Sequence, residues 1–292
     1  MPESATLSTP KYSAVPASPH SSPAWLSASY TLAVREVVRF LRQRSRVMSA
    51  IGQPIIFWIL FGAGLAGSFQ AGGGQSGDAV SFQEYFLPGI AVLIVLFTSI
   101  FSSISVIQDR NEGFLQGVLV APVPRASIVL GKVLGGTVLA LIQAILFVAI
   151  APLLQFVHLA PPMHLNFSPL AVLGAILFLA LISLGLCALG YFFAWKIDSI
   201  QGYHGVMSVI LLPMWLISGA FFPGDQSVWL SWLMKLNPLT YGVAGLRQVM
   251  SSSPTGISNL PPFWLCLIVT LAFAVACLLI DIWVTRRDQA IH

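Results

Sequence analysis

Charged residues are scarce in this sequence. Asp, Glu, Lys and Arg make up 8% of its 292 residues, whereas 57% are hydrophobic. A soluble domain carries about 25% charged residues, and a surface with so few charges could not stay dispersed in water. The scarcity excludes a soluble globular protein and predicts an integral membrane protein whose main solvent is lipid.

Residues that support catalysis or metal binding are also few. The three cysteines, Cys187, Cys266 and Cys277, all fall in apolar stretches, where small buried side chains are more common than disulfides or metal ligands. The histidines show no H-E-x-x-H or other metal-ligand spacing. We therefore expect this chain to be no enzyme and to hold no metal or cofactor of its own.

Long apolar runs are abundant. Six of them approach the roughly 20 residues that a helix needs to cross a bilayer, and the Ser- and Pro-rich residues 1–24 before them predict a disordered tail. The sequence thus predicts an all-α polytopic membrane protein with six transmembrane helices. The expected spans are 47–69, 86–107, 133–157, 169–195, 204–222 and 263–284.

The basic residues predict the orientation of these spans. Lys and Arg near span ends favour the cytoplasm, and with six crossings only Lys235 and Arg247 of the 14 basic residues fall on the outer side. Both termini should therefore be cytoplasmic. Because the basic residues are spread as topology determinants, nucleic acid is not an expected partner.

An amphipathic helix is predicted before the first span, over residues 25–46. Such a helix can lie in the plane of the membrane with its arginines near lipid phosphates. Arg44 breaks the pattern, and the stretch could also be a basic segment that serves orientation alone. The expected apolar face is Leu26, Tyr30, Ala33, Val37 and Leu41. The opposite face is Arg35, Arg39, Arg42 and Arg46.

A polar segment, "QDRNEGFLQGVLVAPVPR", separates the second and third spans. Its apolar residues at spacings of one, three and four predict a short helix over 109–121, with Asp109 and Glu112 in the first turn. Pro122 and Pro124 would end it. The segment is either a solvated loop or a helix that docks on a soluble partner.

A second unusual segment precedes the last span. Residues 225–250 read as two short helices separated by Asn237 as a cap and Pro238 at the first helical position. We expect a half-inserted outer hairpin whose Lys235 and Arg247 could meet anionic substrate groups or lipid headgroups. The alternative is a hairpin that only seals the outer mouth of a dimer.

Polar residues inside the spans are few. Thr98, Ser102 and Ser105 share one helical face and could line a path, although bonds between neighbouring helices are the favoured interpretation. Asp281 lies near the inner end of the sixth span, where we expect Arg286 or headgroup water to reach it. The absence of a mid-span charge argues against an ion-coupled carrier.

Two of these segments resemble the ABC-2 type transporter permeases. "DRNEGFLQGVLVAPVPRASIVLGK" is similar to the loop after that family's second span, although Gln116 and Gly117 depart from it. "LNPLTYGVAGLRQVM" is similar to the stretch before the last span, through Asn237, Pro238, Tyr241 and Arg247. The residues that the first match assigns to ATPase coupling are Asp109, Arg110, Glu112, Gly113, Phe114, Leu115, Leu119 and Pro122.

The resemblance implies the permease subunit of an ATP-driven exporter of the drug or polysaccharide type. Two such chains would work with two ATPase subunits, and the pathway would run along spans one, two and five. This chain has no G-x-x-x-x-G-K-[ST] loop, so ATP and Mg²⁺ would bind the partner. The expected cargo is an amphiphilic small molecule, a lipid or a lipid-linked glycan, moved out across the cell inner membrane. The competing classes are a stand-alone carrier or channel and a membrane scaffold without transport.

Overall fold

Helices make up the framework of the protein, which we describe from a computed structural model. The structure describes residues 24–65, 81–120, 123–155, 158, 161, 163–221, 228–252 and 260–287. The tail predicted over residues 1–24 therefore lies outside the described residues except for Ala24. Pro122 and the first three residues of the predicted outer hairpin also lie outside them.

Six helices are long and apolar enough to cross a membrane. A helix satisfies its own backbone hydrogen bonds, which lipid cannot do. The sequence prediction of an all-α protein with six transmembrane helices is therefore confirmed. The six are α2 (Arg44–Leu65), α3 (Phe82–Asn111), α5 (Arg125–Ile150), α6 (Pro169–Lys196), α7 (Ile200–Trp215) and α10 (Phe263–Arg287). Two short helices, η1 (Ala151–Gln155) and η2 (Leu216–Ala220), prolong α5 and α7.

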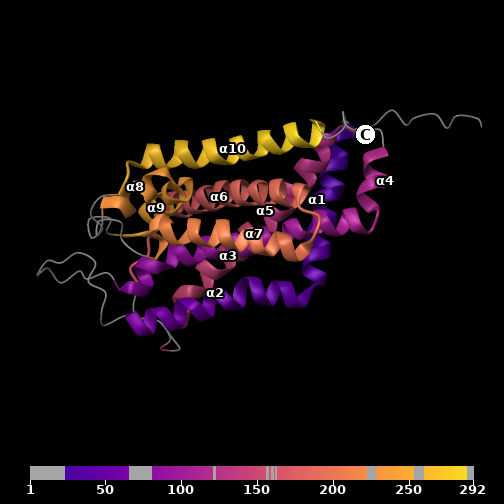
Figure 1. The fold of residues 1–292 in the computed structure, drawn as a ribbon. Helices are drawn as coiled ribbons and strands as arrows, with labels where there is room; N and C mark the ends of the chain where they lie inside the picture. The colour runs from indigo at the N-terminus through magenta and orange to yellow at the C-terminus, as the bar shows by residue number, and fades with distance from the viewer. Residues whose placement is uncertain are drawn as a thin grey trace, which may run out of the picture.

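The long helices form one bundle around α3 (Figure 1). Almost every residue of α3 is buried, whereas α2 and α10 bury only one side. Large aliphatic and aromatic side chains are exposed on the outer helices. That distribution suits a bundle whose outer surface faces hydrocarbon and whose central helix touches only protein.

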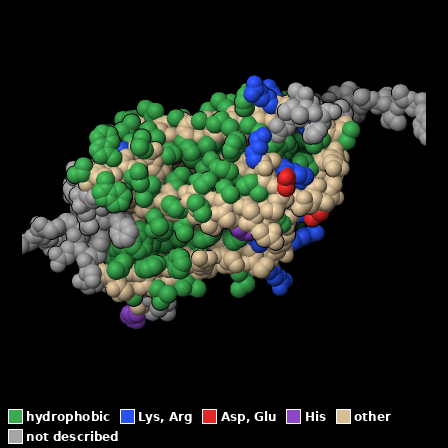
Figure 2. Space-filling model, viewed as in Figure 1, with side chains coloured by type: hydrophobic (Ala, Val, Ile, Leu, Met, Phe, Trp, Pro, Cys, Tyr) green, Lys and Arg blue, Asp and Glu red, His purple; other side chains and the backbone are tan. Residues whose placement is uncertain are grey.

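The short helices lie at the two ends of the bundle. At one end, α1 (Ala24–Arg42) runs across the long helices, with α4 (Phe114–Val120) beside it, and at the other end lie α8 (Val228–Leu236) and α9 (Pro238–Met250) (Figure 1). The C-terminal end of α10 is at the α1 end. On the face shown in Figure 2, most charged side chains gather at the α1 end, and hydrophobic ones cover the middle.

Two predicted boundaries differ from the structure. The helix predicted over 25–46 is divided, because α1 ends at Arg42 and α2 begins at Arg44, so Arg46 belongs to the first span. The second span extends to Asn111, and Gly113 then adopts a φ of +76° before α4 begins. A glycine in this conformation is a common way to end a helix. Asp109 therefore lies in the last turn of α3 and not in the first turn of the short helix.

Candidate functional site

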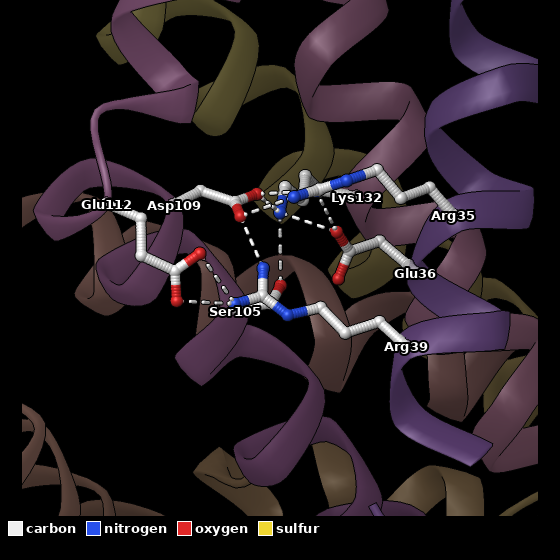
Figure 3. Close-up of polar contacts among 7 residues, drawn as sticks. All are labelled: Arg35, Glu36, Arg39, Ser105, Asp109, Glu112 and Lys132. Atoms are coloured by element: carbon white, nitrogen blue, oxygen red, sulfur yellow. Dashed lines mark hydrogen bonds and ion pairs between the residues drawn. The ribbon is translucent and has the colours of Figure 1, made fainter. Parts of the chain in front are cut away.

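An ionic cluster joins three helices at the α1 end of the bundle (Figure 3). Three carboxylates and three cations balance one another within it. They come from α1, from the end of α3 with the residue after it, and from α5, and a serine of α3 completes the group. The members are Arg35, Glu36, Arg39, Ser105, Asp109, Glu112 and Lys132.

Asp109 lies at the centre of the ionic cluster, and its side chain is 0% exposed. Arg35 Nη1 and Nη2 donate to its two carboxylate oxygens at 2.9 and 2.8 Å, in a bidentate pair. Arg39 and Lys132 also donate to this carboxylate. The C-terminal end of a helix disfavours negative charge, so the three cations offset both the helix dipole and the loss of water.

Lys132 lies inside α5, two turns from its start, and only 5% of it is exposed. Its Nζ donates to Glu36 Oε1 at 2.6 Å and to Ser105 Oγ at 3.2 Å, in addition to Asp109. All three donors of the ammonium group are thereby used. Lys132 thus connects α1 with α3 through one buried cation on α5.

Two glycines of α5 allow α1 to come this close. A Cβ at Gly131 would lie 2.5 Å from Leu32 Cβ, and one at Gly135 would lie 2.8 Å from Glu36 Cβ. Carbon atoms cannot approach to such distances without displacement. Because neither glycine has a side chain, α1 packs close enough to α5 for Glu36 to reach Lys132. Lys132 lies between the two glycines in the sequence.

The cluster continues to α4 through the two arginines of α1. Arg39 Nη2 donates to both carboxylate oxygens of Glu112, at 3.1 and 3.3 Å. Arg35 Cζ lies 3.7 Å from the centre of the Phe114 ring, a cation–π contact. The hydrogen bond from Arg35 to Asp109 is the main cause that raises the pKa of the Arg35 guanidinium. Arg35 therefore remains charged under all ordinary conditions.

The surface of α4 is only partly covered. Leu115 is buried against the bundle, Leu119 is half-buried, and Phe114, Gln116 and Val120 are exposed. A groove of about 680 Å³ separates α4 from α1. Its lining is Ser27, Ala28, Thr31, Leu32, Phe114, Gly117, Val118 and Val123.

Arg110 points away from the cluster. Its Nη1 donates to Asp198 Oδ1 at 2.7 Å, and its Nη2 donates to the carbonyl oxygen of Trp195 at 2.5 Å. These bonds fasten the end of α3 to the junction between α6 and α7. Asp198 is 89% exposed, so this ion pair is solvated, unlike the pairs of Asp109.

The expectation that all the arginines of α1 lie near lipid phosphates is wrong for Arg35 and Arg39, which pair with Asp109 and Glu112. Arg42 is exposed at the end of α1. The buried face of α1 is Ser29, Leu32, Glu36 and Phe40. Sequence reasoning missed Glu36 and counted Lys132 only for orientation. The spacing of Leu32, Glu36 and Phe40, four residues apart, was the available signal.

At the opposite end, Asn237 caps α9. Its Oδ1 accepts from the backbone N–H of Leu239 at 3.0 Å, and its Nδ2 donates to the carbonyl oxygen of Met214 at 2.6 Å. Pro238 occupies the first helical position. Tyr241 donates to the carbonyl oxygen of Lys235 at 3.0 Å, which ties α9 to the end of α8.

Arg247 was expected to meet anionic substrate groups or lipid headgroups, which requires an accessible side chain. It is instead buried, with 6% of it exposed. Its Nη2 donates to the carbonyl oxygens of Gly219, at 2.9 Å, and Tyr85, at 3.2 Å. The guanidinium carbon lies 3.9 Å from the centre of the Tyr85 ring. Arg247 thus joins α9 to α3 and to η2, whose Gly219 has a φ of +75°.

The surroundings of Asp281 also differ from those predicted, which were Arg286 or headgroup water. Its exposure is 1%, and neither carboxylate oxygen has a hydrogen-bond partner among the described residues, so Arg286 does not pair with it. Thr98 donates to Gln143 of α5, and Ser105 accepts from Lys132. These two residues therefore bond neighbouring helices, as the favoured interpretation expected.

Comparisons with known proteins indicate the same family as the two sequence segments. The model of a family described as ABC-2 type transporter matches residues 28–251. A putative transport permease, ycf38, of Cyanophora paradoxa is 30% identical over 227 residues, 77% of this chain and 74% of that protein.

Two further relatives carry more specific names. The daunorubicin resistance ABC transporter permease protein DrrB1 of Streptomyces coeruleorubidus is 20% identical over 77% of this chain and 75% of its own length. A probable multidrug ABC transporter permease, YbhR, of Escherichia coli is 26% identical over 58% of this chain and 44% of its own length. This chain belongs to the ABC-2 type transporter family and is a multi-pass membrane permease subunit of an ABC transporter.

Proposed function

We propose that this chain is the translocation half of an ATP-driven exporter. Family membership implies an ABC ATPase partner and a dimeric assembly. In the proposed complex, two permease chains work with two ATPase subunits, and ATP and Mg²⁺ bind the ATPases. The cargo is an amphiphilic small molecule, a lipid or a lipid-linked glycan, which moves out of the cytoplasm.

The ionic cluster is the observation that carries this proposal. It connects α4, which is exposed enough to meet a partner, with three helices of the membrane domain. Breaking a buried ion pair costs about 3–5 kcal/mol, so the ends of α1, α3 and α5 should move as one unit. If the ATPase displaced α4, the ends of α1, α3 and α5 would then be displaced with it.

The charges at the α1 end of the molecule support a proposal for its orientation in the membrane. The cluster, the end of α3 with Arg110, and the C-terminal end of α10 with Arg286 and Arg287 all lie at the α1 end. The positive-inside rule places that end in the cytoplasm, where the ATPase is. We therefore propose that both termini are cytoplasmic and that the protein lies in the cell inner membrane.

The names of two relatives support a directly exported small molecule. One relative is named for daunorubicin resistance and another as a probable multidrug permease. By family resemblance, the pathway would run along α2, α3 and α7 in a dimer. Lipid would surround the exposed apolar helices and could supply a lipid or lipid-linked cargo.

Reconstitution tests this function. The chain and its P-loop ATPase are placed together in liposomes with the ATPase outside, and accumulation of a fluorescent amphiphile inside is followed after ATP addition. We expect accumulation that disappears with an ATPase variant that binds but cannot hydrolyse ATP. Accumulation driven by an ion gradient without ATP would show a secondary carrier, and no accumulation under either condition would favour a scaffold.

A further inference from the structure

A recess opens between α5, α6 and the end of α9, at the end of the bundle opposite the ionic cluster. Its volume is about 240 Å³. Ile145 and Val148 of α5 form one wall, Ala175 and Leu179 of α6 form another, and Met250 of α9 closes the third side. It shares no residue with the ionic cluster or the groove beside α4.

Small side chains and backbone bonds create this recess. Ala171 and Ala175 stand one turn apart on α6 and leave space that larger residues would fill. The chain before α6 then pairs with the end of α9. The backbone N–H of Asn166 donates to the carbonyl oxygen of Met250 at 2.9 Å. The backbone N–H of Ser252 donates to the carbonyl oxygen of His164 at 3.2 Å. These backbone hydrogen bonds hold the end of α9 and the segment before α6 together at the edge of the recess.

The lining determines what can occupy the space. It consists of apolar side chains apart from Asn166, and no charged residue is among the lining residues. Water needs two to four polar partners in such a site, whereas a dry apolar cavity of about 150 Å³ takes up benzene. A hydrocarbon occupant is favoured because an empty space forfeits dispersion contacts with its walls.

The surroundings identify the source of that hydrocarbon. Leu146, Ile150, Leu170 and Leu173 neighbour the lining residues in sequence and are exposed on α5 and α6. Both helices are among the six candidate spans, so these side chains face the lipid. We propose that the recess binds one acyl chain of a phospholipid from the leaflet at the α9 end. The bound chain fixes α9, which carries Arg247, against α5 and α6, whatever the exported cargo is.

Photolabelling tests this site. The complete chain is reconstituted with a phospholipid that carries a diazirine on one acyl chain, and the labelled peptides are quantified by mass spectrometry. We expect peptides of 145–149 and 171–179 to be labelled at least fivefold more than the lipid-facing peptide of α10. Ala175→Phe, which fills the recess, should remove this excess, whereas Leu173→Phe, which faces lipid on the same helix, should leave it unchanged.

Three outcomes would overturn the proposal. One is uniform labelling of all lipid-facing peptides, and another is excess labelling that survives Ala175→Phe. The third is preferential labelling by a diazirine fatty acid but not by the phospholipid, since the occupant would then be a free fatty acid. If Ala175→Phe does not fold, Ala149→Leu on the opposite wall provides the same comparison.

Discussion

Asp109 has no exposed side-chain surface, yet it contacts two arginines and a lysine. Arg35 and Arg39 lie on successive turns of α1, and Lys132 lies on α5. The carboxylate therefore holds together three cations that would otherwise repel one another. Removing its charge would leave the cluster with an excess of buried positive charge. Asp109 is therefore expected to matter more for stability than any other acid of the cluster.

Asp109→Asn should lower the stability of the folded chain by about 3–5 kcal/mol, the usual cost of leaving buried charges unpaired. The measurement is thermal unfolding of the detergent-purified protein. Asp198→Asn is the matched control, because its ion pair with Arg110 is solvated and worth at most about 1 kcal/mol. Equal effects of the two substitutions would show that burial of the cluster does not matter.

Glu112→Lys acts at the junction between α3 and α4. It places a second cation beside Arg39, in place of a partly exposed ion pair. We expect normal membrane insertion and a several-fold loss of cargo-stimulated ATPase activity in the reconstituted complex. Glu112→Gln, which removes charge without reversing it, should lose less. If Glu112→Lys kept normal partner binding and transport, the coupling surface would lie elsewhere.

The helices α1 and α5 meet at a spacing set by glycine. A Cβ at Gly131 has no room beside Leu32, while a Cβ at Gly117 in α4 has nothing within 4 Å. Replacing glycine with alanine should therefore destabilise the protein at position 131 and stabilise it at position 117, although both residues are helical.

Gly131→Ala should destabilise by about 1–3 kcal/mol, as overpacking does, and should weaken the contact of Glu36 with Lys132. Gly117→Ala should stabilise by up to about 1 kcal/mol, because alanine is the better helix former. Thermal unfolding of both variants under one detergent condition makes the comparison. A neutral Gly131→Ala would mean that α1 can move away from α5 at no cost.

At the scale of elements, the sequence predicts what depends on composition and local chemistry. The six spans follow from long apolar runs, and the cap at Asn237 follows from its own side chain and the proline after it. The sequence pattern predicts the end of the second span too early, because it assigns Asp109 and Arg110 to a separate short helix over 109–121. Their partners on other helices allow α3 to continue through them.

The contents of the candidate site were only partly predictable. Asp109 and Glu112 could be singled out from their segment, but the bonded pair Glu36 and Lys132 lies outside it, and its two members are 96 residues apart in the chain. The sequence predicts Arg247 in an outer hairpin, open to substrate or headgroups, and Asp281 near the inner end of its span, within reach of Arg286 or headgroup water. The structure buries both, Arg247 on backbone carbonyls, and such tertiary surroundings cannot be read from residue type.

At the scale of the whole molecule, the two ends of the bundle differ in kind. One end holds the ionic cluster and the exposed helix α4, and the other holds α8 and α9, the helix that carries the buried Arg247. The chain joins these ends through α3, which contacts α2, α5, α6, α7 and α9. A movement imposed at α4 therefore has a continuous packed route to the opposite end.

We propose that an ATPase acts on this permease through α4. The most direct measurement places a photo-reactive amino acid at Gln116, which is exposed on α4, cross-links in native membranes and identifies the adduct by mass spectrometry. Trp232, exposed on α8 at the other end, is the matched control position. We predict a P-loop ATPase attached through position 116 and none through position 232. Recovery of the intact chain with no ATPase at position 116 would show that the ATPase does not act through α4.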